Sequence, residues 1–166
     1  MKFEDVIRER FSTRSFKDEK VNKEQLDKIL EAGRIAPTAK NNQPIKIYVI
    51  ESEDALNKIN GCSPCIYGAK TVLLVCADKD SSYHKGTYST FEIDASIVAT
   101  HMILEATNVG VDSVWVEMFD NEKVKEYFNL SYEPICLLPL GYRKDDYKPS
   151  PMHSTRKDIS ELVEYR

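Results

Sequence analysis

The segment TVLLVCA, Thr71 to Ala77, is apolar at every position after its threonine. A short apolar run without polar alternation is typical of a strand that is buried on both faces. We therefore expect residues 71–77 to lie at the centre of a β-sheet.

Further strands are predicted on both sides of this segment. Ile45, Ile47 and Val49 alternate with Lys46 and Tyr48, which indicates a half-buried strand. VDSVWV (111–116) and PICLLPLGY (134–142) predict two more strands. The stretch SSYHKGTYST (81–90) is polar and aromatic without periodicity, so it predicts a mobile loop.

Two helices are predicted with well-marked ends. One begins at a capping box formed by Asn22 and Gln25 and ends before Pro37, with an apolar stripe made of Leu26, Ile29, Leu30 and Gly33. A long helix from 91 to 108 is apolar on more than one side, as expected for a central or interface helix. Shorter helices are predicted around residues 3–7 and 54–59, after a cap at Asn121, and after Asp158 in a tail that is otherwise extended from Pro149. This irregular mixture predicts an α+β fold in a single domain, 1–166.

Composition restricts the class of protein. The chain has 166 residues with 42% hydrophobic content, enough for one buried core. Its net charge of -4 argues against binding to nucleic acid or to a membrane surface. We see no targeting segment and no apolar run long enough to span a bilayer, so we expect a cytoplasmic protein.

The stretch RERFSTRSF, Arg8 to Phe16, is unusually rich in groups that bind anions. If residues 10–14 are extended, Arg10, Ser12 and Arg14 lie on one face, because side chains alternate along extended backbone. Two guanidinium groups and a hydroxyl on one face suit a phosphate. The alternative is a solvated basic turn.

Three other motifs follow along the chain. They are APTAKNNQP (36–44), GVDSVWVEMFD (110–120) and HSTRKD (153–158). With RFSTRSF, in this order and at these positions relative to the expected helices and strands, the chain resembles the flavin-dependent nitroreductase family over essentially its whole length.

The resemblance implies a nitroreductase-like fold, a central mixed β-sheet flanked by helices, and a dimer that binds FMN. In that family, residues matching Arg10, Phe11, Ser12 and Arg14 bind the cofactor, the arginines and serine at its phosphate, with Arg14 nearer the pyrimidine edge of the ring. Arg156 matches a basic residue that completes the phosphate site.

The same resemblance assigns the remaining site residues. The motif 36–44 reaches the flavin of the other subunit in a homodimer, through Pro37, Thr38, Ala39, Asn41 and Gln43. The segment Trp115, Val116, Glu117 and Met118 passes the N5 edge of the flavin, where the backbone N–H groups of Glu117 and Met118 face N5. No metal site is implied.

The implied activity is transfer of hydride from NAD(P)H, through flavin N5, to a small oxidised acceptor of the nitroaromatic or quinone type, in a ping-pong mechanism. Two alternatives stay open: non-reductive flavin chemistry, such as flavin fragmentation or dehalogenation, and an FMN storage or sensor module. Ile45 and Met118 replace an aromatic residue and a glycine found in many relatives, which leaves the substrate open.

Cysteine and histidine residues offer weaker hypotheses. CSPC, Cys62 to Cys65, has redox or zinc binding as an alternative to a structural role, whereas Cys76 and Cys136 lie in predicted strands as core residues. His84 either shapes the substrate pocket or is a solvated loop residue, and His101 is expected to pack within the long helix.

Overall fold

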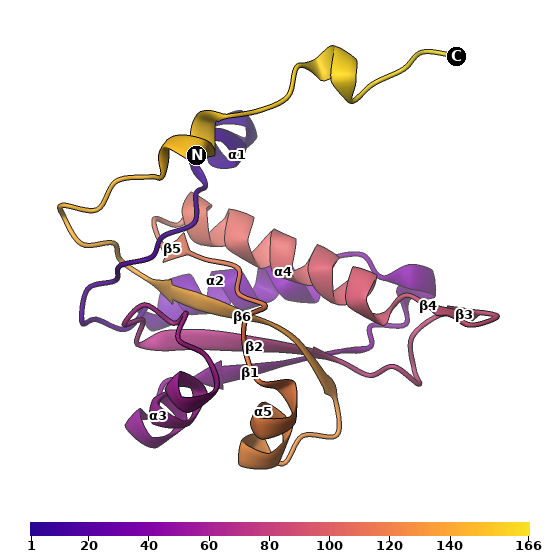
Figure 1. Cartoon of the computed structure of the whole chain (residues 1–166), viewed down its shortest axis with the longest axis horizontal. Helices are drawn as coiled ribbons and strands as arrows, with labels where there is room; N and C mark the ends of the chain where they lie inside the picture. Colours follow the sequence, from indigo (N-terminus) through magenta and orange to yellow (C-terminus); the bar gives the residue numbers. More distant parts are fainter.

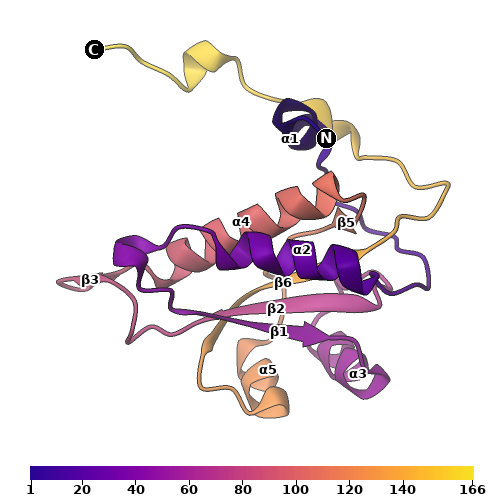
Figure 2. The same cartoon turned by 180° about the vertical axis from the view of Figure 1, so that it is seen from behind.

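A four-stranded sheet divides the molecule into two layers of helices (Figures 1 and 2). The computed structural model describes residues 1–166. In spatial order the strands are β1 (Ile45–Ile50), β2 (Thr71–Ala77), β6 (Glu133–Gly141) and β5 (Asp112–Ser113). Helices α2 (Lys23–Arg34) and α4 (Phe91–Asn108) cover one face, and α3 (Glu53–Cys62) and α5 (Asn121–Phe128) cover the other.

The strand β2 lies inside the sheet, as the sequence predicts, and all seven of its residues are buried. It pairs antiparallel with β1 and with β6, while an isolated parallel bridge joins Ser12 to Ser113 on β5. Leu73 and Val75 point toward α2 and α4, and Leu74 points to the opposite core. The predicted α+β fold is confirmed.

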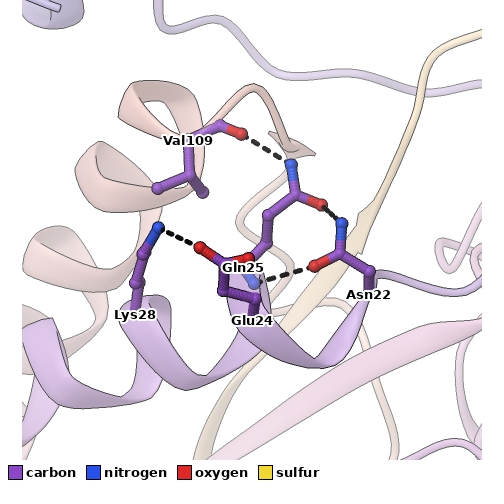
Figure 3. A network of polar contacts seen from close by, with 5 residues as sticks. All are labelled: Asn22, Glu24, Gln25, Lys28 and Val109. Atoms are coloured by element: carbon purple, nitrogen blue, oxygen red, sulfur yellow. Dashed lines mark hydrogen bonds and ion pairs between the residues drawn. The ribbon is translucent and has the colours of Figure 1, made fainter.

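Helices α2 and α4 are joined by a polar network at one end (Figure 3). The Asn22 side chain accepts a hydrogen bond from the Gln25 backbone N–H (2.9 Å), which is one half of the predicted capping box. The Gln25 side chain does not complete the box, because its Nε2 donates to the Val109 carbonyl at the end of α4 (2.6 Å) and its Oε1 accepts from the Tyr142 hydroxyl (2.6 Å). The network therefore fixes α2 against α4 and the end of the sheet.

Close packing of the same two helices depends on Gly33, and this gives a stability prediction. A Cβ at position 33 would lie 2.9 Å from Cγ and Sδ of the fully buried Met102. We expect Gly33→Ala to lower the free energy of unfolding by about 1 kcal/mol, because overpacking outweighs the gain in helix propensity. Gly61 in α3 has no atom within 4 Å of such a Cβ, so Gly61→Ala should instead stabilise by up to about 1 kcal/mol. Urea denaturation of both variants tests this, and a stabilised Gly33→Ala protein would contradict it.

Two cysteine thiols lie deep in the two cores. Cys76 and Cys136 are fully buried, and burial raises the pKa of the Cys76 thiol to about 12 and that of Cys136 further still. Both thiols therefore stay protonated and unreactive up to strongly alkaline pH.

Burial also raises the pKa of Cys62, whereas Cys65 is half-buried. We expect a thiol reagent at neutral pH to modify Cys65 first, and Cys76 and Cys136 only after denaturant is added; rapid native labelling of either core thiol would contradict this.

Several predicted elements differ in the structure. The sequence predicts a loop without regular structure over residues 81–90, whereas the structure contains a hairpin there. Its strands are β3 (His84–Lys85) and β4 (Tyr88–Ser89), and its turn uses Gly86 at φ 62°. The strand predicted over 111–116 is regular only at Asp112–Ser113, because the neighbouring Pro139 has no N–H to extend the ladder. The helix predicted to be capped at Asn121 is capped by Asp120.

The N-terminal helix and the first part of the C-terminal tail lie side by side beyond the C-terminal end of α4, while the C-terminus itself projects away (Figures 1 and 2). Helix α1 (Phe3–Glu9) lies beside a short 3₁₀ helix, Pro151–Ser154, and a second 3₁₀ helix, Ile159–Glu161, follows in the projecting tail. None of the helices combines the length and the apolar character needed to cross a membrane.

Candidate functional site

A pocket of about 240 Å³ lies between the loop after α1 and the C-terminal tail. Four of the predicted residues from the N-terminal stretch and Arg156 from the tail line it together. Its full lining consists of Arg10, Phe11, Ser12, Arg14, Ser150, Met152, His153 and Arg156. We call it the arginine pocket.

The extended backbone of residues 10–14 explains this arrangement. Thr13 points inward, is fully buried, and donates its backbone N–H to the Ser113 carbonyl (3.0 Å). Its neighbours Ser12 and Arg14 therefore point the other way, into the pocket. Because side chains alternate along this extended backbone, Arg10, Ser12 and Arg14 all line the same pocket.

The arginine pocket is strongly cationic and has no acidic lining residue. Arg10, Arg14 and Arg156 form no ion pair with any carboxylate, and Arg156 donates only to the backbone carbonyls of Met152 and Thr155. Burial lowers the pKa of the Arg10 guanidinium, and the nearby charge of Arg156 lowers it further. An anion bound here would relieve this repulsion and supply the missing hydrogen-bond acceptors.

Aromatic contacts hold the tail against the N-terminal loop. The ring of Phe11 stacks on Tyr147 with centroids 6.3 Å apart and meets His153 edge-on at 5.9 Å. The Tyr147 hydroxyl donates to the Ser12 carbonyl (3.2 Å), and the Arg143 guanidinium lies 5.1 Å from the Phe11 ring centroid. The sequence around Tyr147 and His153 does not indicate that these two side chains contact Phe11, so neither was predicted as a site residue.

The second predicted group, residues 37–43, forms a tight loop at the opposite end of α4 (Figure 2). Lys40, Asn41 and Gln43 have φ between 52° and 57°, a conformation uncommon for residues other than glycine. The Thr38 hydroxyl accepts from the Gln43 backbone N–H (3.0 Å), and the Gln43 amide donates to the Asn41 carbonyl (3.1 Å). These bonds support a backbone shape that would otherwise be unfavourable.

Asp94 fastens this loop to the first turn of α4. Its carboxylate, only 1% exposed, accepts from the Ala39 backbone N–H (2.8 Å) and from the Thr90 hydroxyl (2.8 Å). Sequence reasoning missed this residue. The available signal was a carboxylate among the apolar residues of the long helix, since a buried charge needs partners.

The third predicted group lies where the chain leaves β5. Val116 is buried and bridges to Leu137, while Glu117 and Met118 are exposed. Neither the Glu117 nor the Met118 backbone N–H donates a hydrogen bond within the chain. The Glu117 carboxylate accepts from the Trp115 indole N–H (2.8 Å), and the Met118 carbonyl accepts from the Ser63 hydroxyl (2.7 Å). Two backbone donors are therefore available to a ligand.

One chain does not bring the predicted groups into one pocket. Thr38 and Gln43 line a separate cavity between α2 and β1, and Glu117 lines another beside Glu92 and Asn121. The Ala39 backbone N–H is hydrogen-bonded to Asp94 near the start of α4. The N-terminal amine, which lies on the same side of the molecule as the arginine pocket, is hydrogen-bonded to Asn108 at the end of α4 (Figure 2). A helix of 18 residues is about 27 Å long, so the loop 37–43 and the arginine pocket lie far apart in a single chain.

The sequence profile of the Nitroreductase family matches residues 7–62 and 57–142. The chain belongs to the nitroreductase family. The predicted family and its fold are therefore confirmed.

Solved and curated relatives of this nitroreductase-family chain cover most of its length. The crystal structure of a nitroreductase family protein from Clostridium difficile 630 is 39% identical, with a TM-score of 0.91 over 99% of this chain and 98% of that one. A protein of Archaeoglobus fulgidus, whose name pairs NADH dehydrogenase with NAD(P)H nitroreductase, is 28% identical over 85% of both chains. The FMN reductase [NAD(P)H] of Bacillus subtilis is 40% identical over 40% of this chain and 28% of its own.

The residues of this nitroreductase-family chain suit a flavin mononucleotide chemically. Three guanidinium groups without carboxylate partners and two serine hydroxyls match the acceptors of a phosphate. The unused N–H groups at 117 and 118 match an acceptor on a flavin ring.

Proposed function

We propose that this protein is an NAD(P)H-dependent FMN oxidoreductase that reduces a small nitroaromatic or quinone-type acceptor in a ping-pong cycle. Its relatives include proteins named NAD(P)H nitroreductase and FMN reductase [NAD(P)H], which supports NAD(P)H as the donor and a flavin as the cofactor. The observation that carries the proposal is the arginine pocket. Three guanidinium groups, those of Arg10, Arg14 and Arg156, line it, and no carboxylate lines it or pairs with them.

In this proposal, Arg10, Ser12 and Arg156 bind the FMN phosphate, and Arg14 lies nearer the ring. Bound FMN would supply hydride chemistry at N5. The chain's own part is to orient that ring, with the backbone N–H groups of Glu117 and Met118 as donors at its edge. Phe11, Trp115 and Val116 also contact the cofactor in this proposal, since Phe11 lines the arginine pocket and the other two residues lead directly into the segment at N5.

We propose further that the protein acts as a homodimer. A second copy placed antiparallel along α4 would bring Pro37, Thr38, Ala39, Asn41 and Gln43 of one chain toward the arginine pocket of the other. An uncovered groove along α4, lined by Ile93, Ile97 and His101 among others, supports this arrangement. So do the exposed apolar residues of the tail, such as Leu162 (66%) and Tyr165 (95%).

Anaerobic stopped-flow spectroscopy tests the catalytic proposal. Purified protein should show the visible absorbance of oxidised flavin after FMN is added, and this absorbance should bleach on mixing with NADH or NADPH. A second mixing with a nitroaromatic or a quinone should restore it. Protein that does not bind FMN would overturn the proposal. A flavin that binds but stays oxidised would favour non-reductive chemistry or an FMN storage role instead.

Sedimentation tests the homodimer separately. We expect a stable dimer that buries on the order of 2,000 Å² or more. A monomer that still binds FMN with full affinity would contradict the shared site. A cytoplasmic location remains a prediction from the sequence.

A further inference from the structure

His153 is a residue of the arginine pocket for which neither the sequence motifs nor the family resemblance gives a role. It lies on the 3₁₀ helix Pro151–Ser154, is half-buried, and lines the pocket together with Arg10, Arg14 and Arg156. Its ring is held edge-on against Phe11 at 5.9 Å. Neither ring nitrogen makes a hydrogen bond within the chain.

The charges around His153 come from three segments. The N-terminal loop contributes Arg10 and Arg14, and the tail contributes Arg156. The segment after β6 places the Arg143 guanidinium 5.1 Å from the centroid of the same Phe11 ring that His153 contacts. Arg143 is already paired with Asp112 (3.4 Å), and no carboxylate lines the pocket. A phosphate bound in this pocket would lie beside the imidazole as well as the guanidinium groups, and a negative charge there would favour the protonated imidazole.

We propose that His153 is a phosphate ligand whose protonation is coupled to binding of FMN. This inference rests on the proposed function, because it assumes that the FMN phosphate enters the arginine pocket. Histidine is the side chain whose charge ordinarily changes between pH 5 and 8. Binding therefore takes up a proton on His153, and lowering the pH through this range strengthens the contribution of His153 to FMN affinity.

The FMN phosphate also titrates, and its effect has the opposite sign. A phosphate monoester loses its second proton near pH 6, so the more negative form, which the arginines prefer, increases as pH rises. This effect is the same for all variants and cancels when two proteins are compared at each pH. The comparison therefore isolates His153.

The experiment measures FMN dissociation constants by quenching of flavin fluorescence at about pH 6 and about pH 8. The proteins are the wild type, His153→Gln, and His84→Gln, which removes an exposed histidine of β3 that does not line the arginine pocket. We expect the advantage of wild type over His153→Gln to be roughly tenfold larger at the lower pH, as for one charge-assisted hydrogen bond. His84→Gln should follow the wild type, and riboflavin, which lacks the phosphate, should show no such difference.

The outcomes separate this inference from the proposed function. If wild type and His153→Gln bind FMN with the same pH dependence, the role of His153 is wrong while FMN binding stands. If the wild type binds no FMN at either pH, both are wrong. Wild-type protein gives a check that needs no variant: among the ring-proton NMR signals of its three histidines, that of His153 should shift toward the protonated position when FMN is added, and an unmoved signal would overturn the inference.

Discussion

Replacing Arg10 with alanine should weaken FMN binding by about 10- to 150-fold, the loss expected for one charge-assisted hydrogen bond of about 1.5–3 kcal/mol. Arg10 is half-buried in the arginine pocket and has no carboxylate partner, so the variant loses a contact to the ligand and breaks no ion pair. Fluorescence titration of the protein with FMN measures the change.

Arg8→Ala is the matched control, because it removes the same charge. Arg8 is exposed in the last turn of α1 and does not line the pocket. Its loss should leave FMN affinity almost unchanged. Equal losses in the two variants would mean that the loop acts only as a diffuse positive field. Since a phosphate contact is the same in both redox states, turnover of Arg10→Ala saturated with FMN should stay near normal.

Asp94→Ala should lower the free energy of unfolding by about 1–3 kcal/mol, because it removes the acceptor of one part-buried backbone N–H and the shorter of two hydrogen bonds of a buried hydroxyl. These donors are the Ala39 backbone N–H and the Thr90 hydroxyl, each 2.8 Å from the carboxylate. The loop 37–43 would also lose its attachment to α4, so FMN affinity should fall if this loop serves the partner's flavin. Urea denaturation and FMN titration measure the two effects.

Asp94→Asn is the matched control for shape. Its amide oxygen can still accept from Ala39, and its amide nitrogen can donate to the Thr90 hydroxyl, whose proton is free to turn elsewhere. We expect it to retain most of the stability that the alanine variant loses. An Asp94→Ala protein as stable as the wild type would show that the carboxylate does not hold the loop.

Regular elements were predictable where the signal is local. The unbroken apolar run of β2 and the long apolar stretch of α4 can each be recognised from the residues of one segment alone, and both lie where the sequence predicts. The hairpin at 84–89 was missed, because its two strands have only two residues each and no alternating apolar pattern. The end of the strand predicted over 111–116 depends on Pro139 in a distant segment, which no local pattern reveals.

In the candidate site, too, only the residues that share one segment of the chain could be grouped from the sequence. Alternation along extended backbone was enough to group Arg10, Ser12 and Arg14. His153 and Asp94 could not be assigned this way, because their partners, Phe11 and Ala39, are 142 and 55 residues away in the chain. Contacts of this kind depend on tertiary structure, and only the three-dimensional arrangement identifies them.

The contact between the N-terminal loop and the C-terminal tail at the arginine pocket has a consequence for the order of folding. Tyr147 and Ser12, which are hydrogen-bonded, are 135 residues apart, whereas β1 and β2 are joined by one short helical connection. Closing a longer loop costs more conformational entropy, so distant pairings tend to form late. The arginine pocket should thus be among the last parts of the molecule to assemble, and a chain would become able to hold its cofactor only once the rest of its structure is in place.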